Sequence, residues 1–103
     1  MTQAKFSLGQ IVHHRFFDYR GVVFDIDFEY QGSEEWYNSA ARSRPPKDQP
    51  WYHVLVDNAD HETYVAERNL ESSGVMEPIR HPGIDYYFSR LENGVYVPLL
   101  WKN

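Results

Sequence analysis

Apolar and polar residues alternate most regularly between residues 22 and 28. Apolar residues take every even position, and the odd positions hold one valine and two aspartates. Successive side chains of a strand point to opposite faces. The pattern therefore predicts a half-buried strand with an apolar face and a carboxylate face. The residues expected on the apolar face are Val22, Phe24, Ile26 and Phe28.

Further segments have the composition of short strands. Residues 51–57 are rich in aromatic and β-branched residues, and residues 62–66 follow the polar turn at 58–61. Residues 10–15 predict an earlier strand, and residues 67–70 fit either a 3₁₀ turn or a short closing strand. Short strands joined by hairpins favour a mainly β fold, as a small curled sheet or barrel.

The connection at residues 29–50 is long for so small a domain. Ser33 has the character of an N-cap, and Glu34 and Glu35 suit the first turn of a short helix that extends to residue 41. Residues 42–50 contain three prolines and three basic residues, which predict an extended loop. Connections of this length are often functional.

The last third of the chain is the hardest to interpret. Residues 84–91 fit a helix or a strand, Asn93-Gly94 predicts a hairpin, and residues 95–101 fit a strand. We expect a barrel over residues 1–70 and an irregular C-terminal extension over residues 71–103, which packs on the barrel or on a neighbouring subunit. The aromatic candidates for subunit contacts are Tyr86, Tyr87, Phe88, Tyr96 and Trp101.

Composition narrows the function classes. The 103 residues are 17% aromatic, which argues against wholesale disorder, and the net charge is -5. This charge opposes non-specific nucleic-acid binding, but residues 1–50 hold six basic and seven acidic groups, whereas residues 51–103 hold four and eight. The absence of cysteine excludes disulfides and thiolate zinc sites and suits the cytoplasm. No apolar stretch predicts a secretory signal or a membrane span.

No motif predicts catalysis, a cofactor or a metal. The chain contains no nucleophile elbow, no glycine-rich nucleotide loop and no zinc-binding helix motif, so we expect a protein that is not an enzyme. Asp25, Asp27 and Glu29 fit a solvated outer face better than a cation site. His13 and His14 are adjacent on a strand, so their side chains point to opposite faces and do not chelate one metal.

Basic residues with aromatic neighbours form the most informative surface prediction. Arg42, Arg44 and Lys47 lie between the aromatic pairs at 36–37 and 51–52, which suits phosphate contact and stacking. The alternative is that the basic groups pair with nearby acids and that the rings fill the core. The candidate DNA- or partner-binding residues are His14, Arg15, Arg20, Trp36, Arg42, Arg44, Lys47, Trp51, Tyr52 and His53.

Four motifs occur in a fixed order along residues 4–70. They are Gly-Gln-x-Val-x-His at 9–14, Tyr-Arg-Gly-Val at 19–22, Asp-x-Asp at 25–27 and Lys-Asp-Gln-Pro-x-Tyr-His at 47–53. This string resembles the YccV-like, hemimethylated-DNA-binding domain family of the heat shock protein HspQ type.

The resemblance implies a fold and two alternative activities. The implied fold is a small SH3-like β-barrel without catalytic chemistry. One implied activity is binding of DNA that is methylated on a single strand. The other is protein binding that modulates the substrate choice of the Lon protease in proteolysis and the stress response. Family members are also known as homo-oligomers, so the resemblance implies self-association.

Overall fold

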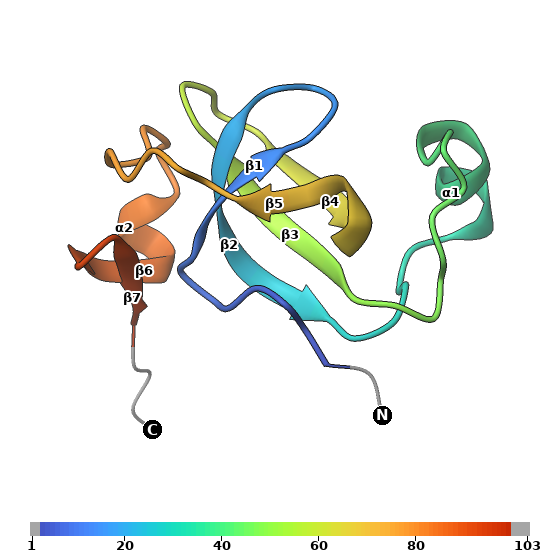
Figure 1. The fold of residues 1–103 in the computed structure, drawn as a ribbon, viewed down its shortest axis with the longest axis horizontal. Helices are drawn as coiled ribbons and strands as arrows, with labels where there is room; N and C mark the ends of the chain where they lie inside the picture. The colour runs from blue at the N-terminus through green and yellow to red at the C-terminus, as the bar shows by residue number, and fades with distance from the viewer. Residues whose placement is uncertain (1–2, 100–103) are drawn as a thin grey trace.

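Five antiparallel strands form one curled sheet. They are β1 (Ile11–His14), β2 (Arg20–Asp27), β3 (Trp51–Val56), β4 (Glu62–Ala66) and β5 (Leu70–Ser72). Their order across the sheet is β4-β3-β2-β1-β5 (Figure 1). The structure is a computed structural model that describes residues 3–99. It confirms the predicted mainly β class.

The sheet does not close into a barrel. A 3₁₀ turn, η1 (Glu67–Asn69), separates β4 from β5, and β5 then pairs with β1 through Val12 and Ser72. Within residues 3–99, no ladder joins β4 to β5. Because η1 carries the chain across the gap, the outer edge of β4 stays unpaired. The prediction of an SH3-like barrel is therefore not confirmed.

A β-bulge interrupts β2 in the middle. Val23 pairs with Val54, but the next pair joins Asp25 to His53, so Phe24 has no partner on β3. A bulged residue shifts the alternation of every side chain that follows it. The bulge therefore reverses which positions of β2 face the inside of the curl.

This reversal overturns the predicted apolar face of β2. Val22 and Phe24 pack on the outer face of the sheet, whereas Val23 and Ile26 pack on the inner face. Phe28 joins neither group and is 55% exposed. Strict alternation from residue 22 to residue 28 was thus wrong, because the pattern carries no sign of the extra residue.

Each face of the sheet has its own hydrophobic core. All five strands contribute to the inner core, which shows how tightly the sheet curls. Its main members are Val12, Val23, Tyr52, Val54, Val65 and Leu70. On the outer face, residues of the last third of the chain cover β1, β2 and β3. The outer core consists of Ile11, Val22, Leu55, Ile79, Phe88 and Tyr96.

The last third of the chain supplies a short helix and a hairpin. Helix α2 (Ile84–Tyr87) leads directly into β6 (Phe88–Glu92), which pairs with β7 (Val95–Pro98). The segment that fits either a helix or a strand is therefore half of each. Asn93 and Gly94 both have positive φ, which confirms the predicted hairpin turn.

The predicted subunit contacts have different positions in the fold. Phe88 and Tyr96 are buried in the outer core, Tyr87 packs against that core, and Tyr86 is exposed. Phe88 and Tyr96 therefore fill the core of their own chain. Trp101 lies outside the described residues.

The long connection contains the expected helix. Helix α1 (Glu34–Ala40) begins after Ser33, whose hydroxyl accepts a hydrogen bond from the N–H of Trp36. Its buried Tyr37 packs with Trp51, the first residue of β3, and anchors the helix there.

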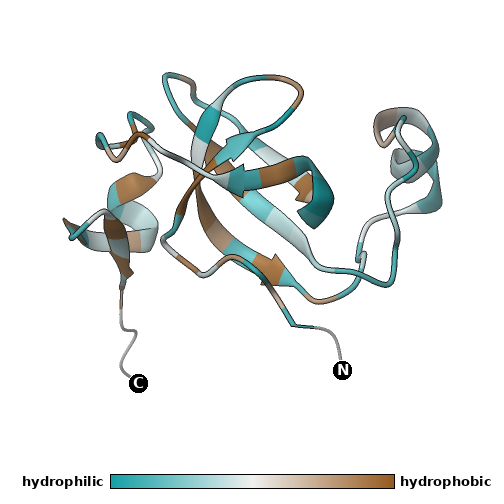
Figure 2. Ribbon diagram, viewed as in Figure 1, coloured by the Kyte–Doolittle hydropathy of each residue, from teal (hydrophilic) through white to brown (hydrophobic). Residues whose placement is uncertain are grey.

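Figure 2 shows that hydrophobic segments lie on the sheet and the C-terminal hairpin, whereas α1 and the following loop are mainly hydrophilic. Neither α1 nor α2 has the length and apolar character that a membrane crossing requires.

Gly9 connects the two cores. Its N–H donates to the carbonyl of Val23 on β2, and its carbonyl accepts from the N–H of Tyr96 on β7, each at 2.8 Å. Its φ is +85°, and a Cβ atom would lie 1.9 Å from the carbonyl oxygen of Tyr96. Only glycine therefore fits this junction.

We predict that Gly9→Ala lowers the free energy of unfolding by about 3 kcal/mol, because it adds backbone strain and a clash with β7. Gly74→Ala is the matched control, since a Cβ there meets no atom within 4 Å. The control should change stability by less than about 0.5 kcal/mol. Urea denaturation of both variants measures the difference. Equal stability of the two variants would contradict the prediction.

Candidate binding groove

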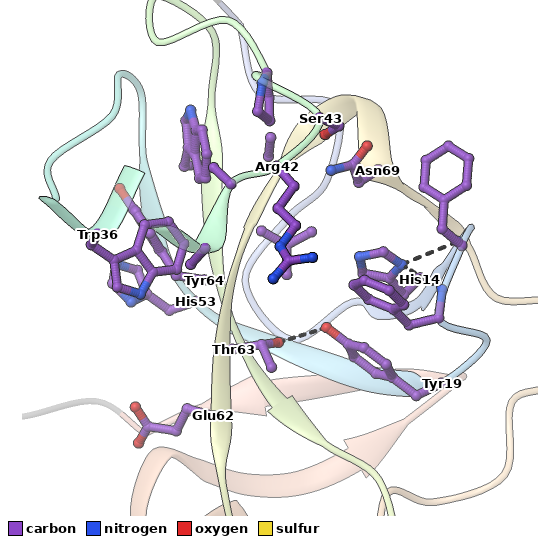
Figure 3. A pocket seen from close by; sticks show the side chains of 18 of the residues that line it. His14, Tyr19, Trp36, Arg42, Ser43, His53, Glu62, Thr63, Tyr64 and Asn69 are labelled. Atoms are coloured by element: carbon purple, nitrogen blue, oxygen red, sulfur yellow. Dashed lines mark hydrogen bonds between the residues drawn. The ribbon is translucent and has the colours of Figure 1, made fainter. Parts of the chain in front are cut away.

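A groove with a volume of about 850 Å³ runs along β4. All five residues of β4 line it, which places the groove at the free edge of the sheet. The turn between β1 and β2 forms one wall, and α1 with the loop after it forms the other (Figure 3). The groove therefore brings together the first hairpin and the long connection.

Three aromatic rings and one imidazole form the hairpin wall. His14 Nδ1 accepts hydrogen bonds from the N–H groups of Phe16 and Phe17 at 3.1 and 3.0 Å. The Phe17 ring stacks on His14, and the Tyr19 hydroxyl lies 2.7 Å from the Thr63 hydroxyl on β4. Phe16 and Phe17 are 66% and 77% exposed, so they present an apolar surface to solvent.

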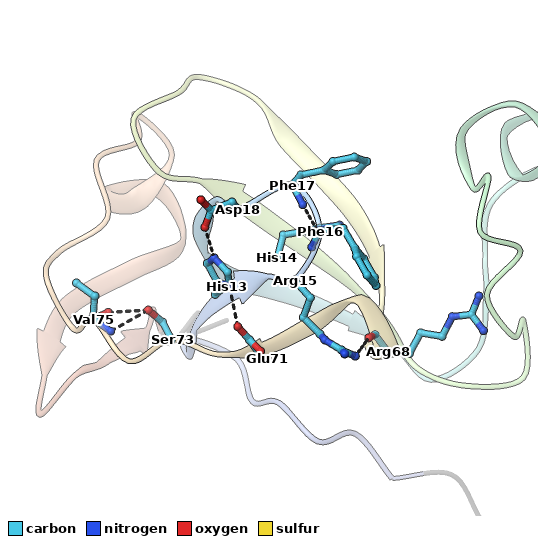
Figure 4. A network of polar contacts seen from close by, with 10 residues as sticks. All are labelled: His13, His14, Arg15, Phe16, Phe17, Asp18, Arg68, Glu71, Ser73 and Val75. Carbon is cyan, nitrogen blue, oxygen red and sulfur yellow. Dashed lines mark hydrogen bonds and ion pairs between the residues drawn. The ribbon is translucent and has the colours of Figure 1, made fainter.

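The neutral state of His14 holds this wall together. Burial lowers the pKa of His14 below its usual 6.5, because the charged imidazolium loses solvation. A proton on Nδ1 would also remove the acceptor of both backbone N–H groups. Neighbouring His13 points to the other side of β1 and contacts Asp18 and Glu71 (Figure 4).

The end of the groove beside Trp36 combines rings with a neighbouring carboxylate. The Trp36 ring packs edge-on against Tyr64. The Tyr64 hydroxyl donates to Asp27 Oδ2 at 2.7 Å, and His53 Nε2 lies 3.0 Å from the same oxygen. Burial and the bond to Asp27 raise the pKa of Tyr64, so the phenol stays protonated. This end of the groove is aromatic and negatively charged.

Within residues 3–99, one group of side chains has the spacing of metal ligands. Asp25, Asp27 and His53 each place one ligand atom within 4.8 Å of the others. The bulge in β2 creates this proximity, which the sequence pattern does not predict. A cation there would compete with Tyr64 and His53 for Asp27 Oδ2. The observed arrangement is a hydrogen-bonded network.

Four arginines lie on or next to η1 and the loop after α1, and of these four Arg42 lines the groove. Arg15 Nη1 donates to the carbonyl of Arg68 at 2.8 Å (Figure 4). Arg68 Nη2 in turn donates to the carbonyl of Ser43 at 2.5 Å. Arg42 and Arg44 flank Ser43 in sequence. None of these four guanidinium groups forms an ion pair with a carboxylate in the described part of the chain. We refer to Arg15, Arg42, Arg44 and Arg68 as the arginine rim.

The arginines of the rim differ in what holds them. Arg44 Nη1 donates to Asn38 Oδ1, and its guanidinium lies over the Tyr37 ring at 5.0 Å. The side chain of Arg42 extends into the groove between the two walls (Figure 3). Arg15 and Arg68 thus donate to backbone carbonyls, the guanidinium groups of Arg15 and Arg44 lie over the rings of Phe16 and Tyr37, and Arg42 projects into the groove.

Two other predicted basic residues are engaged within the chain. Lys47 forms an ion pair with Glu34, and its ammonium lies over the Tyr37 ring at 4.4 Å. Arg20 forms a 3.1 Å ion pair with Asp57 and donates to the carbonyls of residues 75 and 77. Arg20 therefore fixes the start of the C-terminal segment against β2.

The predicted aromatic residues of β3 are core residues. Trp51 and Tyr52 are 1% and 0% exposed. Trp51 Nε1 donates to the carbonyl of Pro46, and the Tyr52 hydroxyl donates to Glu67 Oε2 at 2.6 Å. Burial and the bond to Glu67 raise the pKa of Tyr52, so it stays a hydrogen-bond donor. Of the three candidates on β3, only His53 reaches the groove with a partly exposed ring.

Sequence reasoning missed several residues of the groove and its rim, among them Phe16, Phe17 and Arg68. Arg68 lies in η1, far along the chain from the basic loop, and no local motif marks it. Phe16 and Phe17 belong to a segment that reads as a turn. Two adjacent phenylalanines in a polar turn were the available signal, because turns rarely expose large apolar side chains without a partner.

The two adjacent histidines predict opposite responses to pH. Hydrogen bonds to Asp18 and Glu71 raise the pKa of His13 above 6.5. Its contribution to stability is therefore complete below pH 6.5 and is lost as the pH rises through the raised pKa. The contribution of His14 is complete above pH 6.5 and is lost as the pH falls through its lowered pKa.

We predict that NMR titration shows His13 titrating above pH 6.5 and His14 below it. In urea denaturation, the free energy of unfolding should decline above pH 6.5 by less than about 1 kcal/mol, because the ion pairs of His13 are exposed. His13→Gln should remove this decline. His61→Gln, which removes a side chain without an ion pair among residues 3–99, should keep the decline. Identical pH profiles for His13→Gln and the unaltered protein would refute the role of His13.

Comparison with known families identifies the chain. A family model described as "Hemimethylated DNA-binding protein YccV like" matches residues 4–95. The match includes the whole sheet, both walls of the groove, the arginine rim and the first strand of the C-terminal hairpin. It extends well beyond residues 4–70, where the ordered motifs lie. The chain therefore belongs to the YccV-like family of hemimethylated-DNA-binding proteins.

Proposed function

We propose that this chain binds duplex DNA that is methylated on one strand, and that the arginine rim contacts the phosphates. The observation that carries the proposal is the rim itself. Its four guanidinium groups have no carboxylate partner within residues 3–99, in a chain whose net charge is -5. Guanidinium groups bind phosphate oxygens in a bidentate manner, and those without an ion pair keep their charge available.

The charge distribution along the groove orients the DNA. The carboxylates of Asp27 and Glu62 lie at or beside the groove, away from the rim. Phosphates are repelled from these carboxylates and attracted to the guanidinium groups. We therefore place the duplex over η1 and the loop after α1. Arg20 and Tyr52 are outside this surface, because their polar groups are occupied within the fold.

The exposed rings supply a means of sensing a methyl group. Phe16 and Phe17 stand on the same wall as His14, and the backbone of His14 leads directly into Arg15 of the rim. Apolar side chains recognise base methyl groups by direct contact in the major groove. A duplex held by the rim would bring one base edge near these rings, and a methyl on one strand would add apolar contact there.

The family match supports a binding module and not an enzyme. It names a DNA-binding domain, and we extend this to a non-enzymatic role for the chain. We also propose that the curled sheet is a variant of the SH3-like barrel that the family resemblance implies. Its strands contribute to one inner core, although β4 and β5 do not pair.

A protein partner is the second candidate, as a modulator of substrate choice by the Lon protease. The exposed rings of Phe16 and Phe17 favour it, because adjacent exposed rings are typical of protein interfaces. A degradation assay with purified Lon, with and without this protein, tests it. An unchanged rate for every substrate would exclude this role.

We predict that the double variant Arg44→Gln, Arg68→Gln binds hemimethylated duplex at least about tenfold more weakly at low salt. The slope of the logarithm of the binding constant against the logarithm of salt concentration should correspond to about two fewer phosphate contacts. The double variant Arg80→Gln, Arg90→Gln removes the same charge outside the groove and should bind normally. Fluorescence anisotropy with unmethylated, hemimethylated and fully methylated duplexes of one sequence, at two salt concentrations, measures these effects. Equal affinity for the three duplexes would remove the methylation claim, and absent binding would remove the DNA claim.

A further inference from the structure

The outer edge of β4 has unsatisfied backbone groups. The hydrogen bonds that flank the β3–β4 ladder run from Val56 N–H to the carbonyl of His61, and from Glu67 N–H to the carbonyl of Pro50. Antiparallel pairing alternates, so every second residue of β4 bonds to β3 and the others point away. The outward residues are Glu62, Tyr64 and Ala66.

Within residues 3–99, the backbone N–H and carbonyl groups of Glu62 and Tyr64 and the N–H of Ala66 form no hydrogen bond with a loop. The carbonyl of Ala66 is engaged, because Ala66 is the N-cap of η1. Exposed strand edges are usually protected by lysine, proline, a bulge or a covering loop. The sequence of β4, Glu-Thr-Tyr-Val-Ala, contains no lysine or proline, and its ladder with β3 has no register shift. The C-terminal end of the strand is covered, because Ala66 is buried against Tyr37 and Ala41, so the accessible part of the edge is at Glu62 and Tyr64. The edge is therefore open to pairing with another strand.

The groove confines this edge to one kind of occupant. Five residues of strand extend about 17 Å, and the groove that follows them has a volume of about 850 Å³. Two walls rise beside the edge, with Phe17 on one side and Trp36 on the other. This space fits a single extended segment of about five residues and excludes a helix or a second sheet.

The walls define the side chains of the occupant. Alternate side chains of an added strand point to opposite sides of the sheet. One set would meet Phe17 and Tyr19 of the hairpin, and the other would meet Trp36 and Tyr64. Both walls are aromatic, so β-branched or aromatic residues suit both sets.

Arg42 supplies the charge complementarity. Its side chain extends into the groove, and its guanidinium has no ion pair within the described residues (Figure 3). A carboxylate on the added strand would satisfy it with a charge-assisted hydrogen bond.

We propose that the groove binds an extended peptide segment that adds a sixth strand to the free edge of β4. The segment carries β-branched or aromatic side chains and one acidic residue that faces Arg42. Main-chain hydrogen bonds give affinity in this recognition mode, and the walls and Arg42 give specificity. The proposal does not rest on DNA binding, because its main contacts are the backbone groups of β4. The two proposed ligands share Arg42, which belongs to the rim and also lines the groove.

A single substitution blocks the edge without breaking the sheet. Ala66 has φ -68° and ψ 146°, which proline adopts without strain, and its N–H points away from β3. Ala66→Pro therefore removes one outward donor and adds a ring beside Tyr37 and Ala41, where Ala66 is buried. Circular dichroism and urea denaturation establish that this variant folds.

The probe is a library of random heptapeptides displayed on phage, selected against the full chain, with the consensus peptide then synthesised. We expect enrichment of alternating β-branched or aromatic residues with one Asp or Glu. Alternate amides of an added strand point toward β4. N-methylation of that set should weaken binding at least about tenfold, and N-methylation of the other set should hardly change it. Arg42→Gln should remove the preference for the acidic residue, and Ala66→Pro should abolish peptide binding. DNA affinity is measured in the same variants.

Four results would overturn the proposal. The first is that the library yields no enriched sequence, and the second is that N-methylation of either set of alternate amides has the same effect. The third is that Ala66→Pro binds the peptide unchanged, and the fourth is that the protein is a dimer which Ala66→Pro converts to a monomer. The last result would assign the edge to a second copy of this chain. The N-methylated peptides keep the test decisive if Ala66→Pro fails to fold. Because DNA affinity is measured in the same variants, failure of DNA binding and failure of peptide binding are distinguishable.

Discussion

The register shift at Phe24 decides which side of the sheet every later side chain of β2 faces. Before it, Val22 faces outward, and after it, Ile26 faces inward, so one strand serves two cores. The same shift puts Asp27 beside His53 and Tyr64 at the groove. Without the extra residue, the carboxylate would face the inner core, where burial of an unpaired charge is costly. The chemistry of one end of the groove therefore depends on this backbone irregularity.

Local sequence signals predict the elements of the fold well. Ser33 as N-cap, the Asn93-Gly94 turn and the strands at 51–56 and 62–66 each depend on residues close in sequence. What the sequence does not reveal depends on contacts between distant segments. The bulge in β2 arises from its pairing with β3, and the open edge of β4 arises from η1. Neither has a signature in the hydrophobic pattern.

The candidate site was predictable to a similar extent. Arg42, Arg44 and Trp36 are close in sequence and lie together, since one helix and one loop carry them. Arg68 joins them only because η1 folds back toward Ser43. Trp51 and Tyr52 are candidates for binding from the sequence, but both are buried in the structure. Aromatic residues next to basic residues give the same sequence pattern whether they line a surface or fill a core. Burial on this strand is set by Tyr37 and Glu67, which lie elsewhere in the chain.

The bonds between rim arginines and backbone carbonyls have a kinetic consequence. Arg15 and Arg68 each donate to a carbonyl of another loop, so their long side chains are already ordered in the free protein. An arginine carries about 2 kcal/mol of rotamer entropy, and part of this loss precedes any encounter with a ligand. Through these two bonds, the turn between β1 and β2 is joined to η1, and η1 is joined to the loop after α1. A ligand therefore meets a preformed charge pattern, which favours rapid capture over slow rearrangement.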